Sequence, residues 1–201
     1  METTWNNKVL SDVLGAEEGA SLRIKQVVLV LVGILVLAVA AKIKVPVPGS
    51  PVAINMGTFV VLTVGAAYGA RLGLATILGY MLVGAIGFDI FQSSTAELRG
   101  LTYMTGATGG YLLGYVLATL TLGALAQRGG DRSVLWMALA MRIGTVLIYV
   151  PGLLWLGQLY GWDKPILAWG LTPFLIGDAL KLALAALVLP GVWALVGRAR
   201  A

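Results

Sequence analysis

Long, nearly uncharged apolar segments recur along this chain and constrain its fold more than any other feature. The first covers residues 22–41, where only Arg23 and Lys25, close to the start, are charged. A helix of about 20 residues is about 30 Å long, which matches the hydrocarbon thickness of a bilayer. Such a segment predicts a transmembrane helix.

The composition of the whole chain also indicates a membrane protein. Of 201 residues, 59% are hydrophobic and 11% are charged, and the mean hydropathy is +0.91. A soluble domain carries about 25% charged residues, so this chain has too few polar residues to cover a compact water-soluble core. We therefore expect a multi-pass protein of the cell's inner (plasma) membrane.

Prolines, glycines and charged turns divide the chain into six apolar segments, which predict an all-α, integral membrane six-helix bundle. Helices are expected at about 22–41, 53–70, 72–88, 106–127, 133–156 and from about 166 to Arg198. The very short connection Gly69-Ala70-Arg71 makes the second and third helices antiparallel neighbours. Residues 1–21 are expected to form a cytoplasmic N-terminal tail, and residues 22–201 the membrane domain.

The distribution of basic residues predicts the orientation, because six spans place both termini on one side of the membrane. Seven basic residues fall at the end with the termini: Arg23, Lys25, Arg71, Arg128, Arg132, Arg198 and Arg200. Four fall at the other end: Lys42, Lys44, Arg99 and Lys164. Since Lys and Arg are enriched on the cytoplasmic side, both termini are predicted to be cytoplasmic.

The residue types that are missing exclude several functions. The chain has no Cys and no His, which removes disulfides, imidazole bases and the usual zinc and haem ligands. It has no GxxxxGK[ST], GxSxG or HExxH motif, so we expect no ATP hydrolysis by this chain, no enzyme activity, no cofactor and no metal. The basic residues are scattered and form no patch for nucleic acid.

Asp178 and Lys181 are the charges that most need an explanation, because they lie inside the last apolar segment. Residues three apart share one face of a helix. A charge within the bilayer costs roughly 2.5–3.5 kcal/mol on insertion scales. Either the two side chains satisfy each other as an internal ion pair, or they bind a polar ligand, and the spacing leaves both open.

Several unusual segments converge at the predicted outer end. Three prolines interrupt residues 42–51, whose apolar side chains are typical of a loop folded back as a lid. The polar stretch 89–105, a kink expected at Pro151-Gly152 and the start of the last helix lie at the same end. The sequence therefore predicts a solute site there. Arg142, in contrast, is expected to reach the inner leaflet or a partner subunit.

Three segments together resemble the BioY family, the biotin-binding S components of energy-coupling-factor transporters. They are AKIKVPVPGSPV at 41–52, GATGGYLLGY at 106–115 and PFLIGDALK at 173–181, in this order. The resemblance implies a six-helix bundle with an outward-facing biotin pocket, closed by the first long loop. It also implies a T-type transmembrane subunit and two cytoplasmic ATPases as partners in the lipid bilayer.

The resemblance assigns the site residues as well. Asp178 and Lys181 match the family's pocket carboxylate and amine, which suit biotin because a carboxylate accepts ureido N–H groups and an ammonium donates to oxygen. Asn55 and Gly57 stand where the family has Thr and Gln, and Ala107 replaces a Pro. The remaining expected substrate-binding residues are Thr108 and Tyr111 in the glycine motif and Gln92, Ser93, Ser94 and Arg99 in the outer loop.

Two other functions stay open from the sequence. The chain resembles an S component, but pocket shape cannot be read from residues alone, so another small vitamin is a second candidate ligand. A third hypothesis is a non-transporting structural or assembly subunit, in which the Asp178–Lys181 pair only ties the helix internally.

Overall fold

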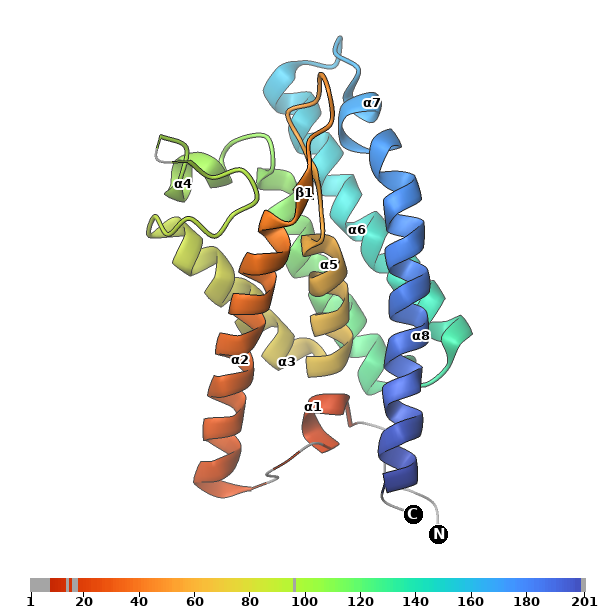
Figure 1. Ribbon diagram of the computed structural model, residues 1–201. Helices are drawn as coiled ribbons and strands as arrows, with labels where there is room; N and C mark the ends of the chain where they lie inside the picture. Colours follow the sequence, from red (N-terminus) through yellow and green to blue (C-terminus); the bar gives the residue numbers. More distant parts are fainter. Residues whose placement is uncertain (1–7, 14, 16–17, 96, 200–201) are drawn as a thin grey trace.

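The computed structural model describes residues 8–13, 15, 18–95 and 97–199, and these form a bundle of long helices (Figure 1). The long helices are α2 (Gly19–Lys42), α3 (Gly57–Ala85), α5 (Gly109–Gln127), α6 (Val134–Tyr160) and α8 (Leu175–Ala199). The short elements are α1 (Leu10–Val13), β1 (Lys44–Val45), β2 (Ile54–Asn55), α4 (Gly100–Met104), α7 (Ile166–Gly170) and the 3-10 helix η1 (Thr172–Phe174). The predicted helical class is confirmed, whereas β1 and β2 were not expected.

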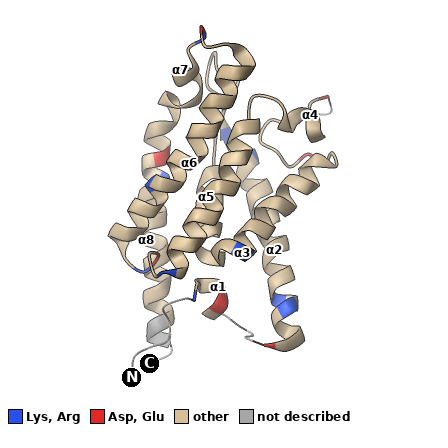
Figure 2. Cartoon of the chain, turned by 180° about the vertical axis from the view of Figure 1, so that it is seen from behind, with Lys and Arg blue, Asp and Glu red and all other residues tan. Residues whose placement is uncertain are grey.

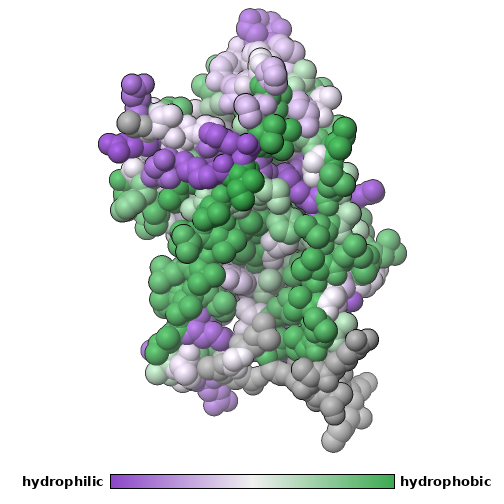
Figure 3. Space-filling model, viewed as in Figure 1, coloured by the Kyte–Doolittle hydropathy of each residue, from purple (hydrophilic) through white to green (hydrophobic). Residues whose placement is uncertain are grey.

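The outer surface of the bundle is apolar enough to face lipid. Among the residues that the structure describes, five stretches are long and apolar enough to cross a membrane, the last of them running through α7, η1 and most of α8. Along α2, Leu31 and Leu35 are 61% and 63% exposed. A broad hydrophobic belt lies below a polar upper zone (Figure 3). An exposed apolar surface of this extent marks a membrane contact.

The connection predicted between the second and third helices lies inside α3. Residues 53–70 and 72–88 were expected to form two helices, and in the structure two helical stretches, 57–68 and 70–85, flank a single non-helical residue, Gly69 (φ 76°, ψ 174°). This backbone conformation is essentially restricted to glycine. The chain folds back here, since a Cβ added to Gly73 would lie 3.4 Å from Gly65 Cα in the first half of the element. The described part of the chain thus has five candidate spans, and the count of six is not confirmed.

Glycines hold α5 closely against its neighbours. Cβ atoms added at Gly110 and Gly114 would lie 2.3 Å from Pro151 O and 2.6 Å from Ile148 Cα, both in α6. The spacing of these two glycines predicted such close helix packing. Gly106, the first of the series, instead lies in the turn before α5. The helix α6 continues through Pro151 to Tyr160, beyond the predicted end at 156.

The two ends of the bundle differ. The start of α2 and the end of α8 lie at one end, called the lower end here, together with α1 (Figure 1). The hairpin of β1 and β2, α4 and α7 lie at the opposite, upper end. Residues 1–7, 14, 16 and 17 of the predicted N-terminal tail are outside the described residues.

Candidate functional site

A cavity lies at the upper end, between the hairpin and the helices α3, α5, α6 and α8. Its walls are mostly aromatic, and the side chains that line it include Tyr80, Phe91, Tyr103, Tyr111, Tyr115, Tyr149 and Phe174. Its polar lining residues are Asn55, Thr58, Gln92, Thr108 and Lys181. The cavity volume is ≈ 40 Å³, enough for a few water molecules. A larger ligand can enter only if part of the wall moves outward.

Asp178 and Lys181 form an ion pair at the wall of this cavity. Lys181 Nζ lies 3.0 Å from Asp178 Oδ1, and the two side chains are only 10% and 12% exposed. Lys181 also donates to Asn55 O at 2.7 Å and to Thr58 Oγ1 at 3.1 Å. Each of these contacts offsets part of the cost of removing the ammonium from water. The charges therefore satisfy each other while the Lys181 side chain still lines the cavity.

Asp178 lies one layer behind Lys181. It does not line the main cavity but borders a smaller one next to it, together with Thr58, Tyr149 and Lys181. The Tyr149 hydroxyl donates to Asp178 Oδ2, and the Tyr149 ring itself lines the main cavity. A carboxylate has about four lone-pair positions, so Asp178 retains acceptor capacity after its contacts with Tyr149 and Lys181.

The proline-rich segment forms the cover of the cavity, because it folds into an antiparallel hairpin in which Lys44 pairs with Asn55. Within the loop of the hairpin, Val52 is 4% exposed and lines the cavity together with Ala53. Ser50 Oγ donates to Trp169 O at 2.8 Å, which ties the loop to α7. The expected lid thus has a defined place, over the upper end of the bundle.

Gln92 and Asn55 connect the hairpin to the segment after α3. Gln92 Nε2 donates to Ala53 O at 2.6 Å, and Asn55 Nδ2 donates to Gln92 Oε1. Asn55 Oδ1 in turn accepts the N–H of Gly57 at 2.5 Å. These bonds fix both amides, which add polar groups to the mostly aromatic lining of the cavity.

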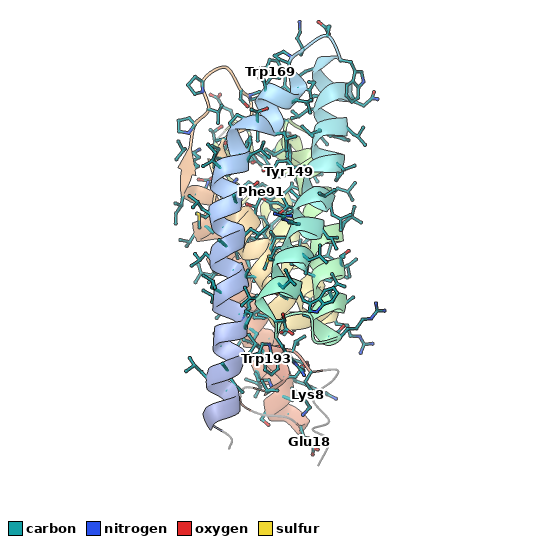
Figure 4. All side chains as sticks on the ribbon, turned by 90° about the vertical axis from the view of Figure 1, so that its right-hand side faces the viewer. Lys8, Glu18, Phe91, Tyr149, Trp169 and Trp193 are labelled. Atoms are coloured by element: carbon teal, nitrogen blue, oxygen red, sulfur yellow. The ribbon has the colours of Figure 1, made fainter. Side chains whose placement is uncertain are left out.

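Most of the aromatic walls were missed by the sequence analysis. Only Tyr111 was expected, and its hydroxyl donates to Gly170 O at 2.9 Å. The rings of Tyr111 and Tyr149 meet edge to face, with centroids 6.0 Å apart. In Figure 4, Tyr149 and Phe91 lie in the upper part of the bundle, below Trp169. The sequence did contain a signal for these residues, because a tyrosine far inside an apolar span needs a hydrogen-bond partner for its hydroxyl.

Besides Asp178, three of the expected residues do not line the cavity. Arg99 is exposed just before α4. Ser94 is buried, but its hydroxyl donates to Phe91 O at 3.0 Å and accepts from Lys42 Nζ at 3.2 Å. Ser93 is half-buried and does not line the cavity. The structure brings together Asn55, Gln92, Thr108, Tyr111 and Lys181, with Asp178 directly behind.

A second ion pair lies outside the cavity at the same end. Lys42 Nζ lies 2.6 Å from Asp89 Oδ1, and the hydrogen bond from Lys42 lowers the pKa of the Asp89 carboxyl below its ordinary value. Both side chains are well exposed, so the pair contributes little to stability. Among the described residues, no group of three or more His, Cys, Asp or Glu side chains could hold a metal ion.

The fold and the site define a class of protein: a multi-pass membrane protein with a covered solute pocket at one end of its helices. A sequence model of the BioY family matches residues 12–198. The chain belongs to the BioY family.

Named relatives agree with this assignment. A protein of Pyrococcus horikoshii described as a probable biotin transporter BioY is 30% identical over 158 residues, which cover 79% of this chain and 91% of that one. The biotin transporter BioY of Thermotoga maritima is 28% identical, over 80% of this chain and 92% of its own. A crystal structure of the S component for biotin from an ECF-type ABC transporter has the same fold, with a TM-score of 0.74 at 16% identity, over 88% of this chain and 95% of that one.

Proposed function

We propose that this protein captures biotin and carries it across the membrane as the substrate-specific S component of an ECF-type ABC transporter. The observation that carries the proposal is the Asp178–Lys181 pair, buried beside an aromatic cavity under a hairpin. The likeness to proteins named biotin transporters supports the choice of biotin over another solute. The role is transport, and no catalytic step is assigned to any residue.

The binding roles of individual residues are part of the proposal. Lys181 donates to a ligand oxygen, and Asp178 accepts a ligand N–H group directly or through the Tyr149 hydroxyl, which can accept an N–H while it donates to Asp178. Asn55, Gln92, Thr108 and Tyr111 supply the polar rim, since all four line the cavity. Arg99, Ser93 and Ser94 would act only if the outer loop closed further over the ligand.

The finer topology is proposed as well. The two halves of α3, residues 57–68 and 70–85, are about 18 Å and 24 Å long at about 1.5 Å per residue. We count them as two short membrane helices that meet at Gly69, which gives six in total. With residues 1–21 as the cytoplasmic tail and 22–201 as the membrane domain, both termini then lie in the cytoplasm and the cavity opens outward.

Reporter fusions test this orientation. Most charged residues lie toward the two ends of the bundle (Figure 2), and the positive-inside rule assigns the lower end to the cytoplasm. A fluorescent protein fused after Ala201 should therefore be fluorescent, and alkaline phosphatase at the same place should be inactive. An active phosphatase fusion at the C-terminus contradicts the orientation and leaves the ligand assignment untouched.

Transport by this chain would require partners that supply energy, because it has no phosphate-binding loop of its own. The partners proposed are a T-type transmembrane subunit and two cytoplasmic ATPases. Co-expression with such a module and measurement of ATP-dependent biotin uptake would test them. Uptake at the same rate without the module would contradict this part of the proposal.

Calorimetric titration of the purified protein with biotin is the direct test of the function. We expect saturable binding of one biotin per chain. A negative heat-capacity change should accompany it, because ligand and cavity bury apolar surface. Competition by other vitamins distinguishes the second candidate ligand. A protein that binds none of them would favour the structural role, which the mutual satisfaction of Asp178 and Lys181 also permits.

A further inference from the structure

A polar cavity of ≈ 220 Å³ lies at the lower end of the bundle, far from the proposed biotin site. It is enclosed by α1, the first turns of α2, the bend of α3 and the end of α5. Two basic side chains, Lys25 and Arg71, line it, together with one acidic side chain, Asp12. The other polar lining residues are Ser11, Gln26, Tyr68 and Gln127.

Within the part of the chain that the structure describes, the charged side chains that line this cavity differ in their contacts. Asp12 Oδ2 accepts the N–H of Val9 at 3.0 Å, and Lys25 Nζ donates to Ser11 O at 3.0 Å. Arg71 is exposed, and within residues 8–13, 15, 18–95 and 97–199 its guanidinium makes no hydrogen bond or ion pair. A guanidinium presents up to five N–H donors in a fork that matches the oxygens of a phosphate.

An apolar groove of ≈ 210 Å³ lies beside the polar cavity, on the outer surface. Gln26 and Leu72 line both spaces, so the two are direct neighbours. The groove runs between α2 and α3, and its walls include Val27 and Leu31, which are 59% and 61% exposed. Along α2 the charged Lys25 comes first and the groove residues follow, deeper in the apolar belt.

We propose that the polar cavity and the groove together bind one phospholipid with an anionic headgroup. Its phosphate lies against Arg71 and Lys25, and one acyl chain follows the groove past Val30. A basic pocket beside an apolar groove between membrane helices complements both parts of such a molecule. Free phosphate would leave the groove empty, and a lipid without net charge would leave the Arg71 guanidinium without a counter-charge. With the proposed orientation, the lipid belongs to the inner leaflet.

Native mass spectrometry tests the proposal on the purified full chain. The protein is equilibrated with equal amounts of phosphatidylglycerol and phosphatidylcholine that carry the same acyl chains. We expect the unaltered protein to retain phosphatidylglycerol preferentially. Arg71→Gln should reduce that preference about fivefold, the effect of one basic side chain near a membrane surface. Arg128→Gln is the matched control, because Arg128 is exposed at the same end but lines neither cavity.

Two further experiments distinguish the phosphate of a lipid from free inorganic phosphate. Val30→Phe fills the groove without changing charge, so it should reduce retention of both lipids. Inorganic phosphate at millimolar concentration should leave the bound lipid in place; displacement of the lipid would show a site for the free ion and would overturn the proposal. Equal lipid preference in Arg71→Gln and Arg128→Gln would also overturn it.

Titration with biotin distinguishes a failure of the lipid site from a failure of the proposed function. Arg71 lies at the opposite end from the cavity that contains Lys181, so Arg71→Gln should bind biotin as the unaltered protein does. A loss of biotin binding in Arg71→Gln would show that the substitution disturbs the whole bundle and would overturn a local lipid site. Failure of the unaltered protein to bind biotin would leave the lipid result standing.

Discussion

Replacing Asp178 with Asn is expected to weaken biotin binding by at least about thirtyfold while the helices still form. The substitution keeps the shape of the side chain but leaves the ammonium of Lys181, whose side chain is only 10% exposed, without its counter-charge. Removing one partner of a buried, hydrogen-bonded charge pair costs about 2–5 kcal/mol. Titration calorimetry of the purified variant measures the change. An affinity equal to that of the unaltered protein would show that Asp178 does not contribute to biotin binding.

The matched control is Asp163→Asn. Asp163 also pairs with a lysine, Lys164, at 2.9 Å, but its side chain is 72% exposed in the turn before α7. Exposed pairs contribute about 0–1 kcal/mol, so this variant should bind biotin normally.

A double variant separates a role in binding from a role in folding. Asp178→Asn alone can lower stability because it leaves a buried cation unpaired. Asp178→Asn combined with Lys181→Met removes both charges, and replacing a buried ion pair with apolar groups is often neutral for stability. We expect the double variant to unfold near the temperature of the unaltered protein and to bind no biotin. Normal binding by the double variant would favour the structural hypothesis for the pair.

Gly123→Ala is expected to be the most destabilising single-methyl change in the bundle. Gly123 in α5 packs against the bend of α3, and a Cβ there would lie 2.2 Å from Ala70 N and 2.5 Å from Ala70 Cα. Backbone atoms cannot rotate away as a side chain can, so α3 and α5 must separate. Overpacking of this kind costs typically 1–3 kcal/mol and occasionally more.

Thermal unfolding in detergent measures this effect, with Gly191→Ala as the control. Gly191 lies within α8, and a Cβ there would meet nothing within 4 Å. Alanine is favoured over glycine within a helix by about 1 kcal/mol, so the control should be unchanged or more stable. A Gly123→Ala protein that unfolds at the same temperature as the control would contradict the close packing of α5 on α3.

Local spacing was enough to predict part of this structure. The apolar segments predicted helices at nearly the right places, and the separation of Asp178 and Lys181 by three residues predicted their shared face. Both features depend only on the period of a helix. The same is true of Gly110 and Gly114, whose spacing places them on the side of α5 that meets α6.

The remaining parts depend on contacts between residues far apart in the chain. Lys181 donates to Asn55 O, and the two residues are 126 positions apart. No period in the sequence links them. The aromatic walls come from several helices and the segment after α3, so each tyrosine taken alone resembled one more apolar residue. The fold-back at Gly69 was located correctly, yet whether it separates two helices or bends one depends on a single backbone conformation.

The hairpin has a kinetic consequence for any guest molecule. Ser50 and Ala53 hold it to α7 and to Gln92, and the space beneath is far too small for a bicyclic vitamin. A ligand can enter only after these bonds break. The rate of entry is therefore set by how often the hairpin opens and not by diffusion. The same bonds, once they re-form above the bound ligand, slow its dissociation. A long residence time then follows without an unusually strong contact to any single side chain.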